Sequence, residues 1–256
     1  MRGELCIGFA SVLSFASMLL LIFVNVGQIN TSTIPRKIFM VRVNMSDYGA
    51  AVQAAISDVN PVLGLYTTNA SAPLQAQKGL RQFYEFGLYS YCAYVDEKAG
   101  ICGNHTIGQR YTPYDIITAD MNLNYSIITA PIIPENTFRD SNYLGANSKG
   151  AYWLILLGTI CAALAVLTGI AKNNFTFFVS AIFSAVGSLF LLVAAGLWTV
   201  MIKKTQAINI AVNPLNQQPL RIIVTEGNGL FLTWAAFVCL FVSIVPYVVS
   251  CCTYRG

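Results

Sequence analysis

The chain has 256 residues, of which 55% are hydrophobic and only 10% are charged, and its formal net charge is +4. A soluble globular domain carries about 25% charged residues, so this composition excludes an ordinary soluble protein and indicates an integral membrane protein. The small positive charge is not gathered in a basic run. That argues against nucleic acid as a partner.

Four apolar stretches are long enough to cross a membrane as helices, which takes about 20 residues each. They cover residues 5–26, 151–171, 175–202 and 229–250. The remaining segments are a short start (1–4), a large polar loop (27–150), a turn (172–174), a second polar loop (203–228) and a tail (251–256). A cleaved signal peptide is the alternative reading of the first stretch. Its length and the lack of an A-x-A-like site after it favour a retained span.

Glycosylation acceptors indicate the orientation better than charge does, because basic residues flank the spans on both sides. The large loop contains five N-x-S/T sequons, headed by Asn30, Asn44, Asn69, Asn104 and Asn124. Chance matches in an Asn-rich loop are the alternative. A sixth match at Asn174 falls at the opposite membrane edge. We expect a multi-pass membrane protein, with the large loop lumenal or extracellular and both termini in the cytosol.

Local patterns predict a small folded domain in the large loop. We expect strands at 38–44, 86–95 and 125–129, a helix from Ser46 or Asp47 to Ser57, and a second helix at 74–83. Residues 28–35 are polar and predicted to be irregular, and residues 136–149 are predicted to be a polar linker. In the second loop, 207–212 and 220–225 predict a β-hairpin that joins the same sheet.

Cys92 and Cys102 are the only cysteines of the large loop. In an oxidising compartment such a pair favours a disulfide, which would contribute about 2–3 kcal/mol in the chain-entropy model. Free thiols, or a metal site that includes His105, are the alternatives. The metal site lacks a fourth ligand and the usual spacing.

Small residues recur at four-residue spacing in two of the spans, where they allow helices to approach closely. They are Gly158 and Ala162 in the second span and Ser180, Ser184 and Ser188 in the third. This pattern favours packing within the bundle, with homo-oligomerisation as the alternative.

Cys251 and Cys252 follow the last span directly. Cysteines beside a membrane on the cytosolic side are candidates for S-palmitoylation. Unmodified thiols are an equally good interpretation.

The sequence contains no recognisable catalytic motif. The interiors of the four spans hold no Asp, Glu, Lys, Arg or His, which argues against proton-coupled transport and ion relays. No G-x-S-x-G, P-loop or H-E-x-x-H pattern occurs, which argues against common hydrolases and nucleotide enzymes. We therefore expect no enzymatic activity, no cofactor and no resident metal.

A short motif gives a family resemblance. Gly87-Leu88-Tyr89, then Cys92 and Cys102, form Gly-Leu-aromatic-x-x-Cys-x9-Cys in the first loop of a four-span chain. This resembles the claudin-like tetraspan superfamily, and the long sequon-bearing loop resembles the fungal Sur/PalI family within it. The third motif position is usually Trp and here is Tyr89. A further triplet, Gly196-Leu197-Trp198, lies inside the third span without a following Cys pair, so we treat it as coincidence.

The resemblance implies a four-helix transmembrane bundle with a small β-rich extracellular domain. Signalling members of the family typically have long cytosolic tails, so the short tail favours the eisosome-type branch. It further implies a non-enzymatic tetraspan of the plasma membrane that organises a cortical membrane domain and supports the cell cortex or wall. Its partners would be membrane lipids, like copies or other membrane proteins, and cell-wall components. The alternatives are an accessory subunit of a wall-synthesis or signalling complex, or a claudin-like adhesion or fusion protein.

Overall fold

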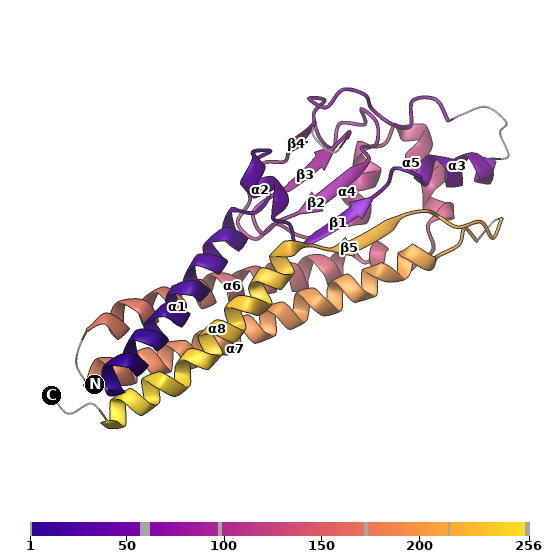
Figure 1. Ribbon diagram of the computed structural model, residues 1–256. Coiled ribbons are helices and arrows are strands. Elements are labelled where there is room, and N and C mark those ends of the chain that lie inside the picture. The colour runs from indigo at the N-terminus through magenta and orange to yellow at the C-terminus, as the bar shows by residue number, and fades with distance from the viewer. Residues whose placement is uncertain (1, 57–61, 97–98, 172–173, 215, 254–256) are drawn as a thin grey trace.

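The computed structural model describes the chain except residues 1, 57–61, 97–98, 172–173, 215 and 254–256. Four long helices form a bundle, α1 (Arg2–Val26), α6 (Ser141–Ile170), α7 (Asn174–Thr205) and α8 (Asn228–Thr253). The polar domain, residues 27–140 and 206–227, lies at one end of this bundle (Figure 1). Its helices are α2 (Thr33–Lys37), α3 (Tyr48–Ile56), α4 (Pro113–Asp120) and α5 (Leu123–Ile132), with 3-10 turns η1 (Thr137–Arg139) and η2 (Gln206–Ile210). Its strands are β1 (Val41–Asn44), β2 (Phe83–Phe86), β3 (Tyr91–Tyr94), β4 (Gly100–Cys102) and β5 (Ile223–Glu226).

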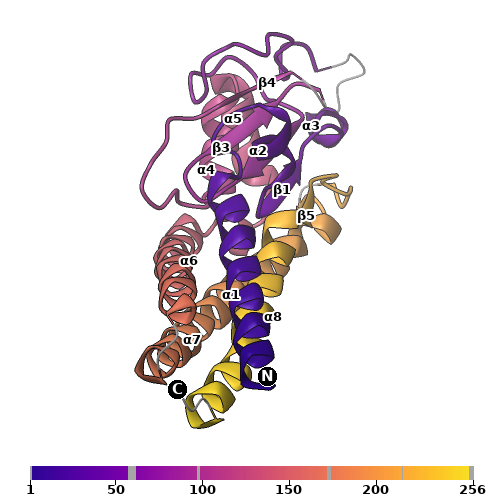
Figure 2. The same ribbon diagram turned by 60° about the vertical axis from the view of Figure 1, so that its left-hand side comes forward.

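The four long helices pack as a closed ring. α1 lies against α6 and α8, and α7 lies between α6 and α8 (Figure 2). All four are long and apolar enough to cross a membrane. Large apolar side chains remain exposed on their outer surface, among them Phe15, Leu167, Phe175, Leu189 and Val245. An apolar outer surface on a helical bundle suits lipid rather than water, so the chain is a multi-pass membrane protein.

The small residues of the spans pack inside the bundle, as predicted. Gly158 on α6 faces α7 so closely that a Cβ there would lie 2.7 Å from Cδ2 of Leu191. The other four residues of the pattern, Ala162, Ser180, Ser184 and Ser188, are buried. The Ser180 hydroxyl lies 2.6 Å from that of Thr168, which joins α7 to α6. The small residues therefore serve helix packing within a single chain.

α6 begins ten residues before the predicted span, so most of the segment 136–149, which was predicted to be a polar linker, is helical. Asp140 caps the helix, because its Oδ1 accepts a hydrogen bond from the Tyr143 N–H at 2.9 Å. Leu144, Gly145 and Ser148 are buried in this extension. Its first turns therefore pack against the polar domain instead of hanging free.

The sheet is antiparallel, with the strand order β4-β3-β2-β1-β5. β5 comes from the second loop and pairs with β1, so the prediction that this loop joins the sheet is confirmed. The first strand of the predicted hairpin was wrong, because Gln206–Ile210 forms the 3-10 turn η2; within the described residues, only an isolated antiparallel bridge, between Val212 and Pro219, remains of the predicted pairing. The Asn209 side chain takes the place of a strand there, donating to Val224 O at 3.0 Å and accepting from Val224 N at 2.7 Å.

Two other predictions in the large loop were wrong. The helix expected at 74–83 is a series of turns with positive φ at Gln75 and Gln77, and it leads into β2. The strand expected at 125–129 belongs to the helix α5. The helix expected after Asp47 is present as α3, and α2 forms at the end of the segment predicted to be irregular. Short apolar runs cannot distinguish a strand from a buried helical turn without their tertiary partners.

A buried ion pair holds the long 62–82 segment to α4. Arg81 Nη1 lies 2.8 Å from Asp120 Oδ2, and both side chains are fully buried. Asp120 also accepts hydrogen bonds from the Tyr84 hydroxyl at 2.8 Å and from the Gln75 N–H at 2.5 Å. Burial raises the pKa of Tyr84 well above its usual value, so the phenol stays a neutral donor. One carboxylate thus organises a segment that has little regular structure.

We expect Asp120→Ala to destabilise the protein by about 3–5 kcal/mol, because Arg81 would be left buried without a counter-charge. Asp115→Ala is the matched control, since Asp115 is exposed on the same helix, and it should change stability by less than about 1 kcal/mol. Thermal unfolding of the purified full chain in detergent measures both variants. Equal melting temperatures would contradict the assigned role of Asp120.

Candidate functional site

The Gly87-Leu88-Tyr89 motif forms the turn between β2 and β3. The single strand predicted over 86–95 is therefore wrong: the chain reverses at this turn, where the Gly87 N–H donates to Ser90 O at 2.9 Å. Leu88 is buried, and its carbonyl accepts from the Gln109 N–H at 3.1 Å. The motif is thus placed where the sheet meets the bundle.

Gly87 lies against the end of α1. A Cβ at this position would lie 2.5 Å from the carbonyl oxygen of Gly27 and 2.9 Å from Cβ of Gln28. Two backbones therefore approach each other more closely than any side chain permits. This is the physical reason for glycine at the first motif position.

Tyr89 links the turn to two helices of the bundle. Its hydroxyl donates to Asn25 Oδ1 at 3.3 Å, and Asn25 Nδ2 donates to Thr159 Oγ1 on α6 at 3.3 Å. Its ring packs edge-on against Tyr152 of α6, with 5.1 Å between centroids. Burial raises the pKa of Tyr89 to about 12, so the hydroxyl remains a donor over the physiological range. The strongly polar residue of the first span, Asn25, is satisfied by this link.

Cys92 and Cys102 form the predicted disulfide. They face each other in the register of β3 and the short edge strand β4, so the bond fastens that strand to the sheet. The exposed His105 has its Nε2 2.6 Å from Ile29 O. Within the described ranges, no three His, Cys, Asp or Glu side chains are placed to hold a metal ion.

Gln28 is a residue of the junction that the sequence analysis missed. It is fully buried with a φ of 56°, and it turns the chain away from α1. Its amide nitrogen donates to Arg36 O at 2.6 Å and to Glu85 Oε2 at 2.9 Å. Its amide oxygen accepts from the Tyr94 hydroxyl at 3.2 Å. A lone glutamine in a polar stretch gives no local signal for such a position.

Glu85 is a buried carboxylate beside this glutamine. Burial raises the pKa of Glu85, and the guanidinium of Arg42, whose Nε lies 2.7 Å from Oε1, partly offsets that effect. Arg42 is held in turn over the rings of Phe39 and Phe83, at 4.9 and 5.5 Å from their centroids. The position of a surface cation is therefore set by a buried acid and two rings.

Four of the five predicted glycosylation acceptors, Asn30, Asn69, Asn104 and Asn124, are exposed on the polar domain. Asn44 is half-buried on β1, where its Oδ1 accepts from the Ser46 N–H at 2.9 Å. Glycosylation of all five stays a prediction. The side chains of Cys251 and Cys252 lie outside the described residues, so their acylation stays a prediction too.

The junction is built from groups that satisfy one another. Tyrosine hydroxyls, side-chain amides, a carboxylate and a guanidinium pair across α1, α6 and the sheet. Trp198 of α7 adds an apolar contact, since its ring lies 6.0 Å from that of Tyr111, which packs edge-on against Phe86 of β2 at 4.9 Å. The arrangement acts as a rigid joint between the sheet and the membrane helices.

We expect Gly87→Ala to destabilise the junction by roughly 1–3 kcal/mol, because the added methyl group would force the turn off the end of α1. Gly150→Ala is the matched control: this exposed helical glycine has open space around its Cβ position. That change should stabilise α6 by up to about 1 kcal/mol. Melting temperatures of the two variants test the assignment, and an unchanged value for Gly87→Ala would refute it.

We expect Cys92→Ser to cost about 2–3 kcal/mol through loss of the cross-link, and to retain the protein in the secretory pathway. Cys239→Ser is the control, since Cys239 is a free cysteine of α8. Surface labelling together with thermal unfolding measures both effects. Normal delivery and stability of Cys92→Ser would show that the disulfide is dispensable.

Comparison with known proteins identifies one family. No curated protein matches the chain. The model of the SUR7/PalI family matches residues 6–245, a range that contains the polar domain, the motif and most of all four long helices. The four-helix bundle with its small antiparallel sheet is a claudin-like tetraspan fold. The chain belongs to the SUR7/PalI family of membrane proteins.

Proposed function

We propose that this protein is a non-enzymatic tetraspan of the plasma membrane that organises a cortical membrane domain and supports the cell cortex or wall. Family membership supports the proposal, because the match takes in both the bundle and the polar domain. In this proposal the polar domain faces outward, towards wall components, and both termini are cytosolic. The position of the five sequons on the polar domain supports that orientation.

The observation that carries the proposal is the attachment of the polar domain to all four helices. The turn at Gly87 seats on α1, and Tyr89 packs on α6. Tyr111 lies beside Trp198 of α7, and β5 leads directly into α8. Alternating-access transport proceeds largely by rocking of one helical unit against another. A domain fixed to every helix suits a static scaffold better.

We expect the full chain, with a fluorescent tag at its C-terminus, to form cortical patches that recover slowly after photobleaching. Gly87→Ala that still reaches the surface should recover faster, because its polar domain is less firmly seated, while Gly150→Ala should match the unchanged protein. Deletion should weaken the cortex or wall. Uniform, mobile surface fluorescence together with no deletion phenotype would reject the proposal.

An accessory-subunit role is the second candidate, and an apolar surface of the polar domain favours it. Leu63, Leu123 and Ile127 are 79%, 57% and 64% exposed. Leu123 and Ile127 share one face of α5, because they lie four residues apart, and α5 is joined to the segment of Leu63 by the Tyr125 hydroxyl, which donates to Leu63 O at 2.6 Å. Exposed apolar side chains grouped in this way are typical of protein contacts. Co-purification with one large membrane protein in fixed stoichiometry would favour this role over a scaffold.

A further inference from the structure

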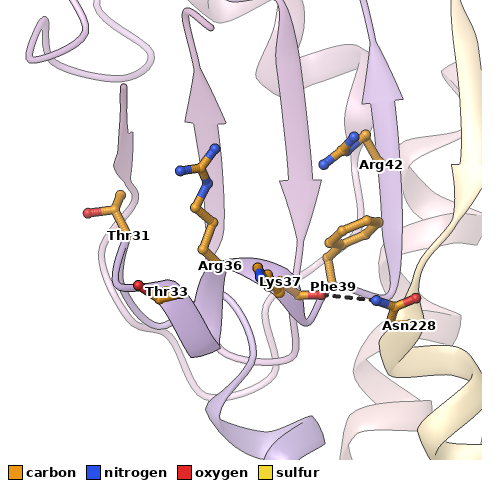
Figure 3. A pocket seen from close by; sticks show the side chains of 7 residues that line it. All are labelled: Thr31, Thr33, Arg36, Lys37, Phe39, Arg42 and Asn228. Carbon is orange, nitrogen blue, oxygen red and sulfur yellow. Dashed lines mark hydrogen bonds between the residues drawn. The ribbon is translucent and has the colours of Figure 1, made fainter. Parts of the chain in front are cut away.

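An open groove of about 550 Å³ lies where the polar domain meets the ends of α1 and α8. It is lined by Thr31, Thr33, Arg36, Lys37, Phe39, Arg42 and Asn228 (Figure 3). The apolar span of α1 ends at Val26, and that of α8 starts at Asn228. The groove is therefore at the level where the hydrocarbon of a bilayer gives way to lipid headgroups.

The charge of the groove is positive. Three of its seven lining residues are cations and none is an acid. Glu85 and Asp96 line a smaller pocket beside it, together with Arg36 and Arg42. Lys37 is exposed and makes no ion pair within the part of the chain that the structure describes. Two threonine hydroxyls and an asparagine amide add uncharged hydrogen-bonding groups.

The guanidinium groups are held in place before any ligand arrives. Arg42 lies over the rings of Phe39 and Phe83 and is paired with Glu85, while Arg36 lies 5.0 Å from the centroid of the Tyr94 ring. A guanidinium presents a planar fork of N–H donors that matches a phosphate. Fixing the fork in advance reduces the entropy lost on binding.

Exposed apolar side chains lie near the ends of the two membrane helices that border the groove. Phe23 lies in the last turn of α1 and Phe231 in the first turn of α8, and they are 43% and 58% exposed. Ile34, between the threonines and Arg36, is 59% exposed. A ligand with a phosphate for the cations and acyl chains for these side chains fits both surfaces. A soluble phosphate would contact only the cations.

We propose that this groove binds the phosphate of an anionic phospholipid in the leaflet that borders the polar domain. Arg36 and Lys37 hold the phosphate, and Phe23 and Phe231 lie along the acyl chains. The inference extends the proposed function, which places the chain in a membrane domain without assigning it a lipid-binding site. It requires a membrane-embedded chain, and it does not require cortical patches.

Native mass spectrometry of the full chain in detergent tests the site by titration with phosphatidic acid, with phosphatidylcholine for comparison. We expect the protein to bind phosphatidic acid about tenfold more tightly than phosphatidylcholine, and Arg36→Ala/Lys37→Ala to lose most of that preference. Lys204→Ala is the matched control, because Lys204 is an exposed cation at the end of α7, outside the groove. It should bind as the unchanged protein does.

Each outcome of this experiment is decisive. An unchanged melting temperature of the double variant shows that its loss of binding is local. Binding of phosphatidic acid by the double variant as tightly as by the unchanged protein would overturn the assignment. If inorganic phosphate displaces the lipid at comparable concentration, the groove binds free phosphate, and the proposal that it binds a phospholipid is wrong. Loss of patches on imaging with intact lipid binding would reject the proposed function alone.

Discussion

The contact between the backbones of Gly87 and Gly27 is the constraint on which the junction depends. It seats the turn of a sheet on the end of a membrane helix, with no side chain between them. The chain must then leave α1 at once, and the left-handed conformation of Gln28 achieves this. The buried amide of Gln28 would be costly without partners, and the carbonyl of Arg36 and the carboxylate of Glu85 supply them. Close approach of two backbones therefore dictates a network of polar groups.

At the protein surface, this network ends in the guanidinium of Arg42, which is bonded to Glu85. Glu85 is nearly inaccessible to solvent, so its charge is costly unless a guanidinium lies beside it. Arg42 supplies this guanidinium from the neighbouring strand, and its guanidinium also lies over the rings of Phe39 and Phe83. The same arginine lines the groove at the membrane boundary. Arg42 therefore both pairs with a buried acid of the sheet and lines the groove.

The order of the strands joins the sheet and the bundle into one unit. β1 follows α1 closely in the chain, and its neighbour β5 leads into α8. α1 and α8 in turn pack against each other in the membrane. Sheet pairing outside the bilayer and helix packing inside it therefore reinforce each other. The disulfide fastens the far edge of the same sheet, where the three-residue strand β4 has a single neighbour.

The four spans, the disulfide, the helix α3 and the addition of the second loop to the sheet could be predicted from the sequence. They follow from long apolar runs, from a single cysteine pair in the large loop and from local propensity, which need no knowledge of distant residues. Tertiary contacts were needed to show that 125–129 is helical, that α6 extends beyond the predicted span and that the motif is a turn. The groove also belongs to this second group, because its cations come from α2 and β1 and its amide from α8, almost 200 residues further along the chain. Such features depend on contacts between segments that are remote in sequence, and no local pattern encodes those contacts.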